Sequence, residues 1–80
     1  MTYISLLTKA GDVDETIARA QPYLWRGFTF GDPFPECDSS GQDSPHWFVI
    51  PITNEDTGAD FHGLANRLGS GLFGAKVVTS

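Results

Sequence analysis

The sequence predicts one small α+β domain spanning residues 1–80, with an antiparallel sheet and two helices, and three observations support this prediction. At 80 residues the chain has room for one core only, because a chain of this size buries roughly 60% of its unfolded surface. Hydrophobic residues make up 40% of the chain and charged residues 19%, which favours a packed core over a disordered acidic chain. Short apolar runs typical of strands alternate with two stretches of helical spacing.

The first two predicted elements are a strand and a helix. Residues 3–8 are mostly apolar and precede a Lys-Ala-Gly-Asp turn, a pattern that favours a buried strand, with a short helix as the alternative. Asp12 and Glu15 have the spacing of a capping box, so a helix is predicted to begin there and to end at Pro22. Its inward stripe is predicted to be Val13, Ile17 and Ala20 or Gln21.

The middle of the chain predicts a strand followed by a long loop. Residues 25–30 place Phe28 and Phe30 on one face, as in a half-buried strand, and Gly27 is predicted to mark a bulge. Residues 31–45 contain three prolines, two glycines, three serines and four carboxylates. This composition predicts a long acidic Pro/Gly/Ser loop, and loops of such length are usually functional or mobile.

The last three predicted elements are a strand, a helix and a strand. Residues 46–52 give the strongest strand signal, with Pro51 tolerable near the strand end. Thr57 and Asp60 have capping-box spacing and predict the start of a second helix. Its apolar stripe is Phe61, Leu64, Ala65, Leu68 and Leu72. Gly69-Ser70-Gly71 is predicted to stop this helix, and residues 75–79 form a last strand.

The resulting order, β-α-β-β-α-β, resembles that of ferredoxin-like folds, in which two helices cover one face of a four-stranded antiparallel sheet. The other face of such a sheet is often open, so its aromatic residues are candidates for contact. The predicted core consists of residues on the inward faces of the proposed elements: Ile4, Leu6, Val13, Ile17, Phe28, Phe48, Ile50, Phe61, Leu64, Leu68 and Val77.

The net charge and the cysteine content indicate which class of partner and which cellular compartment to expect. Ten acidic against five basic residues give a net charge of −5, which argues against direct binding to a nucleic-acid backbone. Cys37 is the single cysteine, so no internal disulfide is possible. The N-terminal residues lack the pattern of an export signal or a membrane span. We therefore expect a cytoplasmic protein without a membrane partner.

Candidate chemical groups do not form a recognisable catalytic or cofactor motif. Cys37 with His46 could act as nucleophile and base, but Cys37 lies in the predicted loop, where nothing lowers its pKa. His46 and His62 lack the spacing of zinc sites. Residues 69–74 match a GxGxxG pattern but follow a helix instead of preceding one. We expect no enzyme activity, no metal and no cofactor.

The leading hypothesis is a non-enzymatic binding protein that occupies a basic surface of a partner protein, including one that otherwise holds nucleic acid. Its size and charge resemble those of small acidic inhibitors encoded by phages, such as anti-CRISPR proteins, although no motif is shared. The predicted partner-binding residues are Asp32, Phe34, Glu36, Asp38, Asp43 and Trp47. One alternative is a ferredoxin-like regulatory or accessory domain that binds a small ligand. A second alternative is a small enzyme that uses Cys37 or His46.

Overall fold

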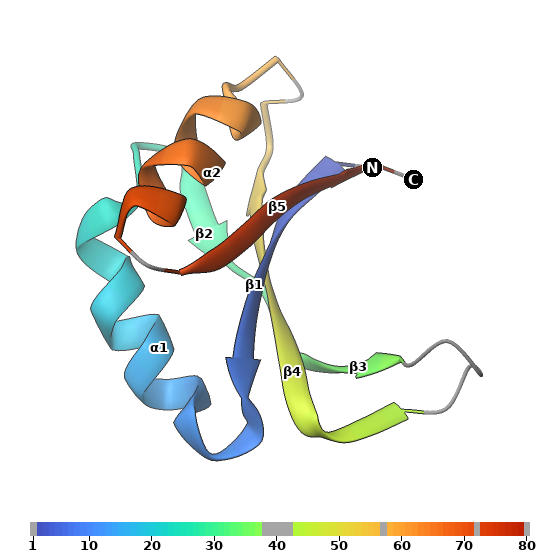
Figure 1. The fold of residues 1–80 in the computed structure, drawn as a ribbon. Helices are drawn as coiled ribbons and strands as arrows, with labels where there is room; N and C mark the ends of the chain where they lie inside the picture. Colours follow the sequence, from blue (N-terminus) through green and yellow to red (C-terminus); the bar gives the residue numbers. More distant parts are fainter. Residues whose placement is uncertain (1, 38–42, 57, 72, 80) are drawn as a thin grey trace.

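The computed structural model describes residues 2–37, 43–56, 58–71 and 73–79 and gives a small α+β domain (Figure 1). The elements in chain order are β1 (Thr2–Lys9), a 3-10 turn (Ala10–Asp12), α1 (Val13–Ala20), a second 3-10 turn (Gln21–Tyr23), β2 (Phe28–Phe30), β3 (Phe34–Cys37), β4 (Asp43–Asn54), α2 (Phe61–Ser70) and β5 (Gly74–Thr79). The predicted α+β class, antiparallel sheet and two helices are confirmed. The sheet has five strands where four were predicted.

The long strand β4 organises the sheet. It pairs with β1 along one edge, while its other edge carries β3 near the start and β2 near the end. The strand order is β2-β4-β1-β5, with β3 also on β4, and every pair is antiparallel. Leu6 of β1 lies between Ile50 of β4 and Ala75 of β5, so the register aligns apolar residues across three strands.

The core lies against the sheet face to which alternate residues of β1 and β4 point, which we call the inner face. Ile4 and Leu6 of β1 are fully buried there, because successive strand residues point to opposite faces. Both helices contribute to the same cluster. Its buried members are Ile4, Leu6, Ala20, Phe28, Ile50, Ile52, Phe61, Leu64, Ala65 and Leu68.

The predicted core is mostly confirmed, with differences at its margin. Val13, Ile17 and Val77 are half-buried and pack against the cluster instead of lying within it. Phe48 is half-buried and lies outside the cluster, because the part of β4 that precedes it extends beyond the helices to pair with β3. The prediction missed Ile52, which closes the core at the end of β4.

The two helix starts differ from each other, although both were predicted as capping boxes. Asp12 makes no side-chain cap hydrogen bond, so the prediction for Asp12 and Glu15 is wrong. The preceding 3-10 turn holds Asp12 at φ −111° and ψ 11°, whereas a capping residue usually has an extended backbone. Asp60 does cap α2, since its Oδ1 accepts a hydrogen bond from the backbone N–H of Gly63 at 2.9 Å. Thr57 lies outside the described residues.

The segment that was predicted to be a strand from residue 25 forms a shorter strand, β2, after a turn. Gly27 has a φ of +90°, and the N–H of Phe28 donates to the carbonyl of Trp25 at 3.1 Å. The glycine therefore occupies a left-handed turn position and not a bulge.

Residues 31–45 are not one loop, because they contain β3 and the first residues of β4. Pro35 lies opposite Phe48, and a bulge follows between Pro35 and Cys37. A proline is tolerated in β3 because this strand lies at the edge of the sheet, where a missing N–H removes no second ladder. One of the three prolines that predicted a loop, Pro35, therefore lies in an edge strand. Asp38 lies outside the described residues.

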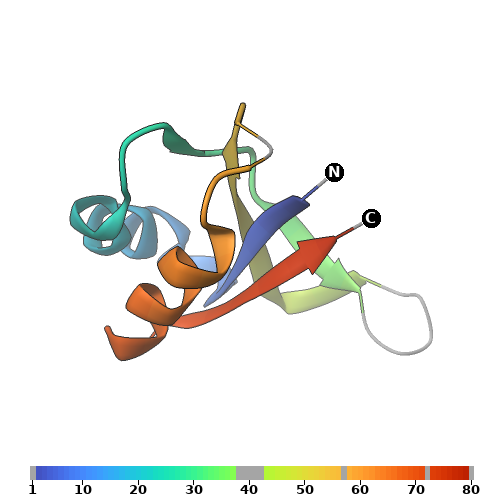
Figure 2. The same ribbon diagram turned by 90° about the horizontal axis from the view of Figure 1, so that it is seen from above.

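Aromatic rings connect the two helices, which lie side by side in Figure 2. Tyr23, just after α1, meets Phe73 edge-on, with ring centroids 5.5 Å apart. The Arg67 guanidinium of α2 lies 5.7 Å from the Tyr23 ring, and that of Arg19 lies 5.3 Å from the Phe73 ring. A Cβ at Gly71 would come within 2.9 Å of the Tyr23 ring. Glycine therefore permits this contact at the end of α2, where the predicted helix stop is confirmed.

Candidate functional site

The sheet has a second face, which we call the outer face and define by the side chains that alternate with those of the core. On β1 these are Tyr3, Ser5 and Leu7, between the core residues of the same strand. Val49 of β4 lies opposite Leu7, and Lys76 of β5 lies opposite Ser5. The outer face therefore carries apolar, hydroxyl and charged groups side by side.

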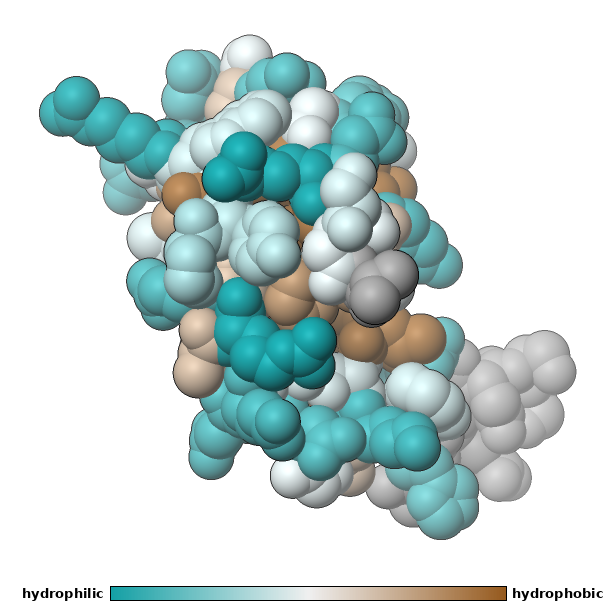
Figure 3. Space-filling view, turned by 60° about the vertical axis from the view of Figure 1, so that its left-hand side comes forward, coloured by the Kyte–Doolittle hydropathy of each residue, from teal (hydrophilic) through white to brown (hydrophobic). Residues whose placement is uncertain are grey.

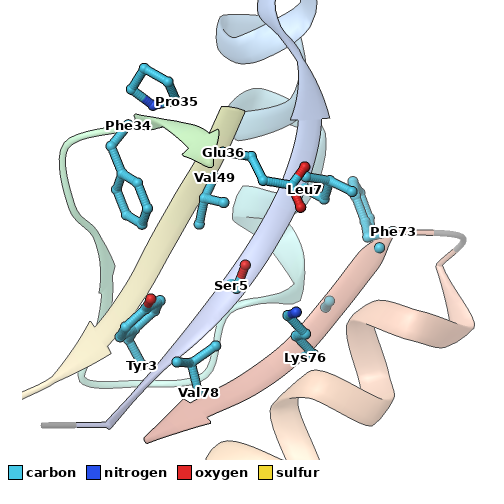
Figure 4. A pocket seen from close by; sticks show the side chains of 12 residues that line it. Tyr3, Ser5, Leu7, Phe34, Pro35, Glu36, Val49, Phe73, Lys76 and Val78 are labelled. Atoms are coloured by element: carbon cyan, nitrogen blue, oxygen red, sulfur yellow. The ribbon is translucent and has the colours of Figure 1, made fainter. Parts of the chain in front are cut away.

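A hollow of about 650 Å³ lies over the outer face (Figure 4). Its floor comes from β1 and β4, one wall from β3, and the other from β5 and the residue before it. The residues that matter here are Tyr3, Ser5, Leu7, Phe34, Glu36, Val49, Lys76 and Val78. The volume lies within the range of about 300–1,000 Å³ that is usual for ligand pockets.

Phe34 forms the rim of this hollow. It lies opposite Val49 in the β3–β4 ladder, and its ring meets the Tyr3 ring edge-on with centroids 6.5 Å apart. Its side chain is nevertheless 40% exposed. The ring is thus supported from one side and open on the other, which is an arrangement suited to contact with another molecule.

The predicted site residues fall into three groups. Phe34 and Glu36 of β3 come together in the hollow, and the exposed Asp32 lies two residues before this strand. Trp47 is 38% exposed and lines a second hollow, of about 390 Å³, with Lys9 and His46. Asp43 opens β4 opposite Cys37. The role of these residues in binding a partner stays a prediction.

Sequence reasoning missed most of the residues that line the large hollow. Ser5, Leu7, Lys76 and Val78 lie in segments that were predicted only as strands. The signal was present in β1, where a serine separates two buried residues, Ile4 and Leu6, and strand alternation places it on the opposite face. The neighbouring strands could not be identified in this way, so the hollow itself was not predictable.

The two histidines that the sequence offered for catalysis or metal binding do not line the large hollow. His46 is exposed and lines the second hollow, while His62 is exposed on α2. Within the described ranges, no group of three His, Cys, Asp or Glu residues is placed to hold a metal ion. Residue 69 lies in the last turn of α2 and residue 74 begins β5, so this GxGxxG pattern precedes a strand and not a helix, as the sequence predicted.

The surface of the molecule on the side of the two helices differs from the outer face, because hydrophilic side chains cover most of it (Figure 3). None of the helices in the described part of the chain is long and apolar enough to cross a membrane.

Comparisons with known proteins do not assign the chain to a family. No family model matches the sequence, and no curated protein or solved structure matches it either. The residues of the outer face and of β3 are therefore the basis for a functional proposal.

Proposed function

We propose that the protein is a small, non-catalytic binding protein that occupies a basic surface of a partner protein through β3. The observation that carries the proposal is Phe34, a large apolar side chain that stays 40% exposed at the rim of the hollow. Asp32 and Glu36 lie beside it in the chain. Interface energy concentrates in a few aromatic or arginine residues, while charges around them steer the approach and specify the partner.

The distribution of charge supports a basic partner. The chain carries a net charge of −5, and two of its arginines, Arg19 and Arg67, lie against aromatic rings between the helices. The charged side chains described in residues 31–37 are both acidic, namely Asp32 and Glu36. A surface that otherwise holds nucleic acid has the complementary charge, which is the mode of action that a phage-type inhibitor such as an anti-CRISPR would use.

We further infer a ferredoxin-like arrangement in which both helices cover the inner face and leave the outer face open. The strand order β2-β4-β1-β5, with antiparallel neighbours, supports this inference, and β3 is then an addition at the edge. Because the chain has a single cysteine, the proposal includes a cytoplasmic location.

The test of this function begins with capture of a partner from cell lysate and continues with the purified partner. Phe34→Ala should lower the affinity by about tenfold or more, as for an interface anchor, without changing the melting temperature. Trp25→Ala is the matched control, because Trp25 is 38% exposed and lies before β2, outside the hollow. It should bind like the original protein.

Charge reversal tests the acidic part of the proposal. Lysine substitutions at the exposed Asp32 and the half-buried Glu36 should slow association and leave the fold intact, since surface substitutions typically change stability by less than about 0.5 kcal/mol each. The predicted site extends this reversal to Asp38 and Asp43. Binding of the original protein should weaken with salt, because screening acts beyond about 10 Å at 0.1 M. Equal binding by the reversed variant, or binding that is indifferent to salt, would exclude recognition by charge.

A further inference from the structure

The floor of the large hollow contains a hydroxyl group that the protein does not bind. Ser5 lines the hollow and is only 5% exposed. Within the described ranges its hydroxyl has no hydrogen-bond partner. In the same ranges, every side-chain oxygen or nitrogen atom that solvent cannot reach does have a partner. The Ser5 oxygen must therefore be open to the hollow. A nearly buried hydroxyl in such a place is usually matched by a water or a bound group.

A cationic group accompanies this hydroxyl. Lys76 of β5 lies directly opposite Ser5 of β1 and lines the same hollow. Figure 4 shows the two side chains next to each other on neighbouring strands. An ammonium and a hydroxyl that face the same space can both donate hydrogen bonds to one carboxylate.

Beyond Ser5 and Lys76, the hollow has an apolar surface and one carboxylate, that of Glu36. Leu7, Val49 and Val78 form an apolar surface next to the Ser5–Lys76 pair. Glu36 comes from β3, which β4 and β1 separate from Lys76 on β5, and its side chain reaches over the hollow toward Leu7 (Figure 4). A molecule with one anionic end fits this arrangement, whereas a second anionic end would approach Glu36 and be repelled.

We propose that this hollow binds a small amphipathic monocarboxylate, whose carboxylate is held by Lys76 and Ser5 and whose apolar body covers Leu7 and Val49. The volume of about 650 Å³ has room for a ligand of this kind. The inference goes beyond the proposed function, because its polar contacts come from β1 and β5, whereas the partner protein is recognised by β3.

The experiment uses four probes that share a ten-carbon chain and differ only in their end groups. Decanoate, decanol, decyltrimethylammonium and decanedioate are titrated into the protein below their micelle concentrations, and binding is followed by calorimetry and by backbone amide chemical shifts. Decanoate should bind about tenfold or more tightly than each of the others, as expected for a charge-assisted contact. The largest shifts should fall in residues 3–7 and 74–78.

Two lysine variants locate the anionic end. Lys76→Gln should lower the affinity for decanoate to that for decanol, while the affinity for decanol stays unchanged. Lys9→Gln is the matched control, because Lys9 is the other lysine and lines the second hollow. Ser5→Ala should weaken decanoate binding less than Lys76→Gln does, and the melting temperature of each variant is measured first. Both exposed lysines can be changed without disturbing the core.

Several results would overturn the proposal. These are the absence of saturable decanoate binding, equal binding of decanol and decanoate, tighter binding of decyltrimethylammonium, and an equal loss in the Lys9→Gln variant. A dimer in sedimentation whose dissociation shifts the amide signals of residues 3–7 and 74–78 would show that a second copy occupies the hollow. None of these measurements involves a partner protein or alters β3, so failure here is distinct from failure of the proposed binding function.

Discussion

The inner and outer faces of the sheet are built from the same strands but have different environments. Leu6 points to the inner face and is fully buried among residues of both helices. Its neighbour Leu7 points to the outer face and is half-buried at the floor of the hollow. Adjacent residues of one strand thus belong to two different surfaces, because the side-chain period of a strand is two.

The two faces of the sheet contribute to different properties of the protein, the inner face to stability and the outer face to binding. Burial on the inner face removes apolar surface from water and supplies most of the free energy of folding. The outer face keeps apolar and polar groups accessible to other molecules. Two of the large exposed hydrophobic residues, Phe34 of β3 and Trp47 of β4, belong to strands that form this face. Substitutions on the two faces should therefore have separable effects on stability and on binding.

The largest expected difference is between Leu6→Ala and Leu7→Ala. Leu6→Ala should lower the free energy of unfolding by about 2–5 kcal/mol, because it leaves a cavity in the core. Leu7→Ala should lower it by about 1 kcal/mol or less, since the hollow already borders this side chain. Urea unfolding of both variants provides the measurement, and equal losses would show that the outer face is also part of the core.

Buried hydroxyl groups provide the second test. The hydroxyls of Thr8 on β1 and Thr16 on α1 are 2.7 Å apart and buried. Thr16→Val removes the hydrogen-bond partner of the Thr8 hydroxyl and should lower the free energy of unfolding by about 1–3 kcal/mol. Changing both Thr8 and Thr16 to valine should cost less than the sum of the two single changes, because neither hydroxyl is then left without a partner.

Ser5 is the matched control for this pair, because its hydroxyl faces the hollow instead of another side chain. Ser5→Ala should change the stability of the ligand-free protein by less than about 0.5 kcal/mol. Additive threonine substitutions, or a Ser5→Ala loss as large as that of Thr16→Val, would contradict the distinction between the faces.

The smallest expected effect concerns the starts of the two helices, both of which contribute residues to the core cluster. Asp60→Ala should destabilise the protein by about 1 kcal/mol, since it removes the cap of α2. Asp12→Ala should change stability by a few tenths of a kcal/mol, because Asp12 makes no cap hydrogen bond to α1. Thermal unfolding of the two alanine variants measures the difference, and equal losses would mean that local charge, not hydrogen-bond geometry, stabilises both helices.

Local patterns were enough to predict most elements of this fold. The apolar run of residues 3–8 and the apolar stripe that begins at Phe61 identified β1 and α2, because buried elements need apolar side chains at the positions that face the core. Leu72, the last residue of the predicted stripe, lies outside the described residues. The capping-box spacing of Thr57 and Asp60 indicated a helix start near these residues, but the structure makes Asp60 itself the cap, so α2 begins at Phe61. Sequence patterns misassigned β3, because two prolines within four positions favour a loop in any local rule.

The sequence by itself determined which residues are apolar, where two helices form and the acidic character of the chain. Only the tertiary structure decided that β4 pairs with β3 along one edge and with β1 along the other. That pairing brings Phe34 next to Tyr3 and encloses the hollow beside Ser5 and Lys76. The physical reason is that a strand's period is encoded locally, whereas its neighbours are chosen by long-range packing of the whole sheet.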